Sequence, residues 1–438
     1  MLFNAADKAL WRLALPMIFS NITVPLLGLV DTAVIGHLDS PVYLGGVAVG
    51  ATATSFLFML LLFLRMSTTG LTAQAFGARD PQRLARALVQ PLGLALAAGA
   101  AIVVLRMPLI DLALHIVGGS EAVLEQARRF LELRWLSAPA SLANLVLLGW
   151  LLGVQYARAP VILLVVGNVL NIVLDLWLVM GLHMNVQGAA LATVTAEYVT
   201  FFIGLLMARR VLALRGVSLS MLKNARRGDI HRLLALNRDI MLRSLLLQLC
   251  FGAVTVYGAR LGADVVAVNA VLMTMLTFTA YALDGFAYAV EAHSGQAYGA
   301  RDDSQLLAVW HAACRQSGMV ALAFALIYGL AGEQIIALLT SLPSLQQLAD
   351  RYLVWQMILP VIGVWCYLLD GMFIGATRGA EMRNSMVVAA AGFGLTLFTL
   401  PWLGNHGLWL ALSVFLALRG LSLGWVWHRH WRNGSWFS

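Results

Sequence analysis

Ionisable side chains that interrupt long apolar runs are the residues of this sequence best placed to do chemistry. An ionised group in apolar surroundings is costly, so it is by default a candidate functional group. The candidates that we single out are Asp31, Arg65, Asp175, Glu197, Asp284, Glu291 and Asp370. Which of them act together depends on their spacing along the elements that carry them.

Asn171 and Asp175 are four residues apart, and Asn168 lies one turn before Asn171, so a helix would place them on one face. A carboxylate beside a carboxamide can hold a proton or supply oxygens to a small cation. Thr193 and Glu197 have the same spacing in the next apolar run. The alternative, which stays open, is that these groups only join helices by hydrogen bonds.

Asp31 stands near the end of the first apolar run, after Pro16 and Pro25. Each proline removes a backbone hydrogen bond and makes a helix easier to bend. Protonation of Asp31 would remove the cost of burying its charge and allow such a helix to repack. We therefore predict a protonation-dependent bend, with Pro16 and Pro25 as the bending positions.

Asp284, Tyr288 and Glu291 follow the i, i+4, i+7 pattern of one helix face, and Asp370 precedes two glycines four residues apart. An acidic, aromatic-lined interior would attract amphipathic cations. The alternative for Asp370 is an ion pair with Arg378, two turns further on. We expect Arg65 to neutralise one of the carboxylates, and His293 to lie at a helix end rather than bind a ligand.

The composition indicates a polytopic membrane protein. Hydrophobic residues make up 61% of the 438 residues and charged residues 11%, with a mean hydropathy of +0.82, whereas soluble domains carry about 25% charged residues. The net charge of +8 could suggest nucleic-acid binding, but basic residues collect in cytoplasmic loops of membrane proteins. We expect no nucleic-acid partner. The three cysteines lack the paired spacing of a metal site, so we also expect no metal and no cofactor.

Twelve apolar segments are long enough to span a bilayer, which predicts an all-α protein. Arg and Lys are concentrated in the even-numbered connections between these segments and in the C-terminal tail, so both termini should be cytoplasmic. Residues 106–134 are the exception, because they place four arginines on the outer side, where acidic residues partly offset their charge. The Trp-rich tail would form an interfacial belt. The predicted spans are 12–36, 45–74, 87–110, 124–152, 159–181, 187–208, 233–257, 266–295, 306–331, 346–375, 384–403 and 407–428.

A phrase of seven residues occurs twice in the chain. It begins at Gln74 as Gln-Ala-Phe-Gly-Ala-Arg-Asp and returns at Gln296 with Tyr in place of Phe, an offset of 222 residues. The same offset relates Gly149 to Gly371 and Gly153 to Gly375, which predicts two copies of one unit. Six spans per copy make the repeats parallel. The predicted parts are an N-lobe (1–208), a basic cytoplasmic linker (209–232) and a C-lobe (233–438).

These patterns together resemble a known family. Leu15-Pro16, Val30-Asp31-Thr32 closing on Gly36, the doubled phrase, Gly188-Ala189-Ala190 and the stretch 283–291 are similar to the multidrug and toxic compound extrusion (MATE) transporters, in particular their DinF-like subfamily. The resemblance implies two six-helix lobes forming a V, and export of organic cations and other xenobiotics in exchange for H⁺ or Na⁺.

The resemblance also implies roles for particular residues. Asp31, Asn171, Asp175 and Thr193 match the N-lobe cation site, and Pro16 matches the proline at which the first helix bends. Asp284 and Glu291 match subfamily positions. Asp370 is out of register with the C-lobe carboxylates that NorM-type members use for Na⁺, which argues against a Na⁺ site there. The intact N-lobe set favours H⁺.

We therefore expect a monomeric H⁺-coupled antiporter of a bacterial inner membrane that exports amphipathic or cationic small molecules. A GxxxxGK[ST] loop and an HExxH pair are absent from the sequence, which argues against an ATP-driven pump and a zinc enzyme. A lipid-intermediate flippase of the same architecture is the alternative. It would need cations for a pyrophosphate, whereas the predicted interior is mostly acidic.

Overall fold

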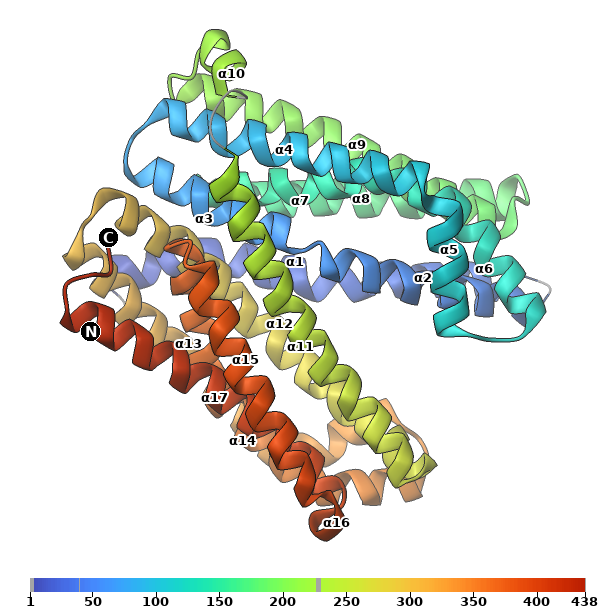
Figure 1. Cartoon of the computed structure of the whole chain (residues 1–438). Helices are drawn as coiled ribbons and strands as arrows, with labels where there is room; N and C mark the ends of the chain where they lie inside the picture. The colour runs from blue at the N-terminus through green and yellow to red at the C-terminus, as the bar shows by residue number, and fades with distance from the viewer. Residues whose placement is uncertain (1–3, 39, 226–229, 438) are drawn as a thin grey trace. The chain divides into compact units, whose positions relative to one another are not determined.

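The computed structural model describes residues 4–38, 40–225 and 230–437, with the backbone alone for residues 23–32. The described residues form helices joined by short connections, with no β-strand among them (Figure 1). The helices of the first half are α1 (Ala5–Gly36), α2 (Pro41–Leu60), α3 (Phe63–Gly77), α4 (Pro81–Val104), α5 (Arg106–Val117), α6 (Glu121–Arg134), the 3₁₀ turn η1 (Trp135–Ser137), α7 (Ala138–Gly153), α8 (Arg158–Asp175), the π-helical η2 (Leu176–Gly181) and α9 (Asn185–Leu214).

The second half begins with a short helix in the segment between the repeats. Its helices are α10 (Leu219–Ala225), α11 (His231–Leu261), α12 (Ala263–Ala300), α13 (Asp303–Leu339), α14 (Pro343–Gly375), α15 (Gly379–Thr396), the 3₁₀ turn η3 (Leu397–Thr399), α16 (Leu400–Leu403) and α17 (Asn405–Arg432). The predicted all-α class is confirmed.

The predicted spans correspond to helices of the structure. Within the described residues, eleven helical segments are long and apolar enough to cross a membrane, and they coincide with the second to twelfth predicted spans. The first predicted span, 12–36, lies in α1, which includes residues with only the backbone described. On α8 the side chains of Val161, Val165, Val169 and Val173 are exposed at four-residue intervals. Such an apolar stripe suits contact with lipid.

The third predicted span is wrong at its end. The sequence predicted 87–110, but α4 stops at Val104 and a separate helix, α5, starts at Arg106. Two of the four arginines of the exceptional segment 106–134 are paired within it: Arg128 with Asp111, and Arg129 with Glu125 at 3.0 Å. These pairs explain how basic residues can gather in a link that the charge pattern assigns to the outside.

The repeated phrase ends one helix and starts the next. In its first copy Arg79 has a left-handed backbone (φ 54°), and Asp80 accepts hydrogen bonds from the N–H groups of Gln82 and Arg83 at the start of α4. In its second copy Arg301 has the same φ, and Asp302 accepts from Gln305 N–H at the start of α13. Capping by Asp satisfies N–H groups that the first turn leaves free. The phrase therefore marks the boundary between two helices at both places.

The paired glycines make the same contact in both halves. A Cβ on Gly149 would lie 2.6 Å from the carbonyl oxygen of Arg65, and one on Gly371 would lie 2.8 Å from that of Ala287. Arg65 and Ala287 are themselves 222 residues apart. The repeat therefore preserves the close packing of α7 on α3 and of α14 on α12.

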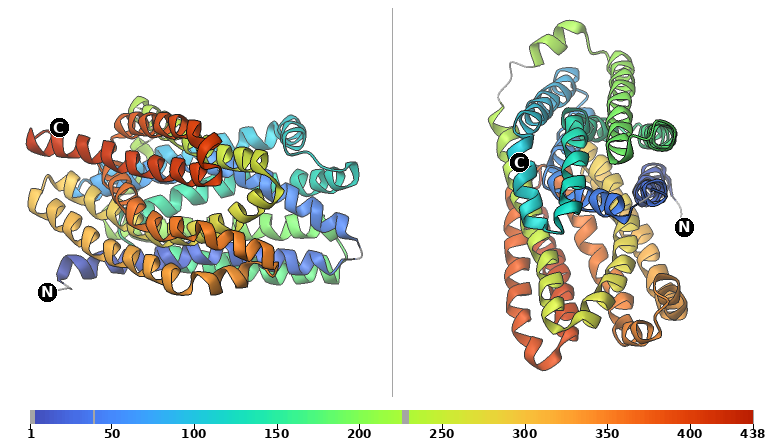
Figure 2. Two further views of the ribbon diagram at one scale, coloured as in Figure 1. Left: turned by 90° about the horizontal axis from the view of Figure 1, so that it is seen from below. Right: turned by 90° about the vertical axis from the view of Figure 1, so that its right-hand side faces the viewer.

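The chain divides into two compact packing units, and one division falls inside α1. One unit consists of Met1–Asn21 with Leu234–Ser438, and the other of Ile22–Leu233. The predicted N-lobe placed all of 1–208 together, so the start of α1 packs differently from that division. The start of α1, dark blue in Figure 2, contacts α12 and α13 of its own unit.

Specific polar contacts hold the start of α1 in that unit. Asp7 pairs with Arg315 of α13 at 3.1 Å, and Trp11 Nε1 donates to Gln316 Oε1 at 2.9 Å. The Trp11 ring meets Phe286 of α12 edge-on, with ring centroids 4.8 Å apart. α1 and α12 also approach each other closely at Gly285, since a Cβ on this residue would lie 2.3 Å from Ile18 Cγ1.

The Trp-rich tail does not form a belt throughout. Trp425 is exposed and lies under Arg429, as an interfacial residue would. Trp436, however, is only 1% exposed, packs edge-on against Phe373 at 5.1 Å and lies under the guanidinium of Arg378. The belt prediction is wrong for Trp436, because the chain turns back after α17 and buries this ring.

Candidate functional site

α8 and α9 bring together three of the four residues of the predicted coupling site. Asn171 and Asp175 are 2% and 0% exposed, on the face of α8 opposite its apolar stripe. Asn171 Nδ2 donates to Thr193 Oγ1 at 3.2 Å, and Thr193 Oγ1 donates to the Ala189 carbonyl of its own helix at 3.2 Å. The i, i+4 spacing thus places the carboxamide and the carboxylate in one buried region.

Asn171 has spare hydrogen-bonding capacity at this point. Its Oδ1 is buried and accepts no hydrogen bond from the described residues. A buried polar atom without a partner is unfavourable and needs a proton donor, a water molecule or an ion. The fourth predicted member, Asp31, has a side chain outside the described residues, as does Pro25. Pro16 lies within α1, where its carbonyl accepts a hydrogen bond from Ser20 Oγ at 2.9 Å.

Local backbone features position the carboxylate. Asp175 is the last residue of α8, directly before the π-helical turn η2; π-turns inside helices often occur at functional sites. The start of α9 approaches this turn closely, since a Cβ on Gly188 would lie 3.1 Å from the Leu178 carbonyl carbon. The Gly-Ala-Ala sequence at the start of α9 therefore supplies the small residues that this contact requires.

Three other predicted polar residues, Glu197, Asn168 and Arg65, lie in this unit. Glu197 accepts from Asn144 Nδ2 at 3.1 Å and lies 3.9 Å from Arg134 Nη2, so its charge is compensated by α6 and α7. Asn168 is partly buried on α8. Arg65 is buried on α3 and donates to Thr69 Oγ1 at 3.3 Å.

Asp370 is the centre of a buried ion-pair network in the other unit. Its Oδ2 accepts from Arg243 Nη2 of α11 at 2.6 Å and also from Arg419 Nη2 of α17. The predicted alternative, a pair with Arg378, is wrong: Arg378 pairs with Glu381 at 3.3 Å and donates to the carbonyls of Ser435 and Trp436. Asp370 thus joins α14 to two other helices.

Arg243 and Arg419 are buried residues that the sequence analysis missed. Both lie inside predicted spans, so the signal that selected the acidic candidates applied to them equally. With Arg65, they add three buried cations to an interior that was predicted to be mostly acidic.

The residues of the polar face predicted on α12 differ in how deeply they are buried. Glu291 is 2% exposed, whereas Asp284 and Tyr288 are partly buried. Asp284 lies near enough to Tyr281 and Tyr367 for electrostatic interaction. His293, in the last two turns of α12, has its Nε2 3.1 Å from the Ala9 carbonyl of α1. Among the described residues, no group of three His, Cys, Asp or Glu side chains could hold a metal ion.

A family model now accounts for both halves of this architecture. The MatE model matches residues 16–177 and again 240–403, once in each repeat. The chain belongs to the MatE family. It is also 84% identical, over 99% of its length and 95% of the relative's, to DNA damage-inducible protein F of Escherichia coli K12. The predicted resemblance to the family is confirmed.

More distant MatE relatives extend the comparison. A probable multidrug resistance protein NorM of Deinococcus radiodurans is 28% identical over 96% of this chain and 94% of its own. The crystal structure of a MATE protein in the bent conformation superposes with a TM-score of 0.84 at 23% identity, covering 99% of this chain and 97% of the other. A MOP superfamily transporter from Pyrococcus furiosus gives 0.82 at 23% identity, covering 100% and 98%. These structures share the fold of this multi-pass membrane protein.

Proposed function

We propose that this chain exports amphipathic or cationic small molecules across a bacterial inner membrane in exchange for protons. Membership of the MatE family and the multidrug resistance name of the NorM relatives support efflux of this kind. The observation that carries the choice of H⁺ is the pair of buried residues Asn171 and Asp175 on α8, with the partly buried Thr193 of α9 bonded to Asn171. We propose that both termini are cytoplasmic, that the protein is monomeric and that it needs no cofactor.

The proposed coupling uses the carboxylate of Asp175 as a proton acceptor, with Asp31 as its counterpart on α1. Protonation removes the cost of a buried charge. The hydrogen bond between Asn171 and Thr193 joins α8 to α9 beside this carboxylate. A change in the protonation state of Asp175 would therefore change the packing energy of α8, η2 and α9. Na⁺ would need several oxygen ligands around one point, whereas a proton needs one carboxylate.

α1 is the element through which this change would reach the second half. Its first turns are fixed to α12 and α13 by Asp7, Trp11 and the close contact at Gly285. The packing division at Asn21 lies between Pro16 and Pro25. A bend between the two prolines would therefore move one part of α1 while the other stays packed, which links Asp31 to alternating access.

A lipid-intermediate flippase is the second candidate, because Arg243 and Arg419 bring two cations into the second half. Both guanidinium groups bond to Asp370, so their charge is already partly compensated. This favours cation efflux over recognition of a pyrophosphate.

Purified protein in liposomes distinguishes these possibilities. We expect a cationic dye to move when a pH gradient is imposed and to remain still when an Na⁺ gradient of the same size is imposed alone. Dye movement driven by Na⁺ alone would contradict proton coupling. Movement of a labelled lipid pyrophosphate with a stationary dye would favour the flippase.

A further inference from the structure

A basic cavity lies in the N-terminal half of α4, away from the proposed coupling site. It has a volume of roughly 120 Å³ and is lined by Arg83 and Arg86 of α4, Arg232 at the start of α11, Gln90, Leu71 and Pro91, among others. All its lining residues belong to the packing unit Ile22–Leu233. The cavity can hold several water molecules, and hence a phosphate group.

Two of the three cations of this cavity, Arg83 and Arg86, have no acidic partner among the described residues. Arg86 Nε is buried and has no hydrogen-bond partner among the described residues. A buried donor without an acceptor is unfavourable, and an oxyanion would satisfy it. Among the described residues that line the cavity, none is acidic.

The structure holds these arginines in place. Asp80 caps α4 through the N–H groups of Gln82 and Arg83, which fixes the first turn. Gln90 Nε2 donates to the Ala225 carbonyl at 3.4 Å and so ties the short helix α10 to α4 (Figure 1). The described lining residues all belong to the helices α3, α4 and α11.

The walls of the cavity indicate the class of ligand. Leu71, Pro91 and Leu233 are apolar and lie beside the three arginines. A soluble anion gains nothing from apolar walls, whereas a phospholipid presents a phosphate next to glycerol and acyl carbons. Basic pockets between helices on the cytoplasmic side are suited to anionic headgroups, and the charge pattern assigns this end of α4 to that side.

We propose that this cavity binds the headgroup phosphate of an anionic phospholipid. Arg83, Arg86 and Arg232 hold the phosphate, and the apolar walls receive the adjoining part of the lipid. The site lies where the connection between the two repeats meets the first one, and it does not depend on which ion the protein couples to.

Native mass spectrometry of the delipidated full-length protein tests this assignment. Phosphatidylglycerol, phosphatidylethanolamine and inorganic phosphate are titrated separately at equal concentrations. We expect phosphatidylglycerol to bind in preference to the other two, and to bind at least about tenfold more weakly to Arg83→Gln/Arg86→Gln/Arg232→Gln, since one charge-assisted hydrogen bond corresponds to roughly that factor. The single variant Arg86→Gln serves as a second test should the triple variant fail to fold.

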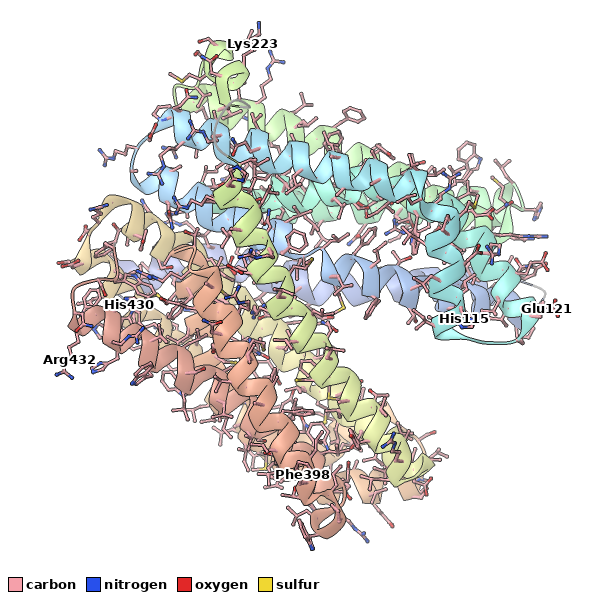
Figure 3. All side chains as sticks on the ribbon, viewed as in Figure 1. His115, Glu121, Lys223, Phe398, His430 and Arg432 are labelled. Carbon is pink, nitrogen blue, oxygen red and sulfur yellow. The ribbon has the colours of Figure 1, made fainter. Side chains whose placement is uncertain are left out.

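The matched control is Arg209→Gln/Arg210→Gln/Lys223→Gln, which removes three exposed cations nearby but outside the cavity. Lys223 projects from the outer end of α10 (Figure 3). We expect this control to bind phosphatidylglycerol as the wild type does. Equal weakening in both triple variants would mean diffuse attraction and would overturn the proposal. Saturation by inorganic phosphate with no preference for lipid would overturn it as well.

Discussion

Asp370 has two buried cationic neighbours, and within the described part of the chain its ion-pair network contains no other acidic residue. Arg243, Arg419 and Asp370 are each less than 10% exposed, so removal of the one carboxylate leaves two guanidinium groups uncompensated. Breaking a buried ion pair in this way costs about 3–5 kcal/mol. We therefore predict that Asp370→Asn unfolds at a markedly lower temperature in detergent, whereas Asp264→Asn, at an exposed acid of α12, unfolds like the wild type.

A triple variant separates charge from shape at the same place. Replacing Asp370, Arg243 and Arg419 together by Leu removes all three charges, and such replacements are often neutral or stabilising. Recovery of stability in the triple variant is the expected result. A triple variant as unstable as Asp370→Asn would mean that side-chain shape, and not uncompensated charge, decides the effect.

Asp7 makes stability depend on pH. Burial by itself would raise the pKa of its carboxyl, but hydrogen bonds from Asn4 N–H and from Arg315 outweigh burial and hold the pKa below its usual value. A carboxyl with a lowered pKa stabilises the folded state above the unfolded pKa, about 4, and loses this contribution as the pH falls through the folded pKa.

We predict that Asp7→Asn melts below the wild type at pH 7, and that the difference narrows as the pH is lowered from 4 to 3. Melting curves at a series of pH values measure it, with Asp264→Asn as the control. A difference that stays constant from pH 7 to pH 3 would contradict an ionised, paired Asp7.

For single residues, the sequence predicted the helix face that a side chain occupies better than the residues that it contacts. The i, i+4 rule placed Asn171 and Asp175 on one buried face, because that rule depends only on helix geometry. The partner of Asp370 was missed, since Arg243 is 127 positions away and Arg419 is on the last helix. Contacts between helices so distant in sequence depend on packing that no local pattern encodes.

Helix packing is where the repeat has its clearest physical effect. Besides the glycines, Thr52 and Thr274, which are equivalent in the two halves, each donate to the carbonyl four residues earlier at 3.0 Å. Gln155 and Thr377 both have a left-handed backbone at the ends of α7 and α14. Equivalent residues therefore repeat hydrogen bonds, turns and helix contacts.

We predict that Gly149→Ala and Gly371→Ala destabilise the protein by similar amounts, about 1–3 kcal/mol each, because each new methyl group meets a backbone oxygen of the neighbouring helix. Gly93→Ala on α4 and Gly318→Ala on α13 are the controls, since a Cβ there meets nothing within 4 Å. They should be neutral or slightly stabilising, as Ala is the better helix former. Thermal unfolding that ranks all four variants alike would contradict a special role for the paired glycines.

Most helices were predictable because a bilayer requires about 20 apolar residues per span. The incorrect predictions concern features that this length requirement does not determine. The break at Leu105 separates two helices that are both apolar in part, and the burial of Trp436 depends on a turn after α17 that lies outside any span.

The whole molecule combines one repeated frame with polar groups that differ between its halves. At the offset of 222, Asn171 corresponds to Phe393 and Asp175 to Leu397, and Asp370 corresponds to Leu148. The first half carries the buried Asn-Asp-Thr group, and the second carries an ion-pair network centred on Asp370. This difference is why we assign proton coupling to the first half and helix-to-helix attachment to the second.

The start of α1 adds a feature that the repeat pattern alone did not predict. Its partners, Arg315, Gln316 and Phe286, all lie in the second half. Sequence periodicity assigned α1 to the first copy, whereas packing assigns its first turns to the second. The whole-molecule proposal, in which α1 transmits a change between halves, depends on this division.

Dye efflux from proteoliposomes carrying Asp175→Asn tests the central claim most directly. With a pH gradient imposed, we predict that this variant moves dye no faster than protein-free liposomes while still binding it, because a carboxamide cannot exchange a proton at neutral pH. Glu197→Gln, at a carboxylate compensated by Arg134 and Asn144, should export at the wild-type rate. Export by Asp175→Asn at the wild-type rate would contradict the assignment of proton coupling to α8 and α9.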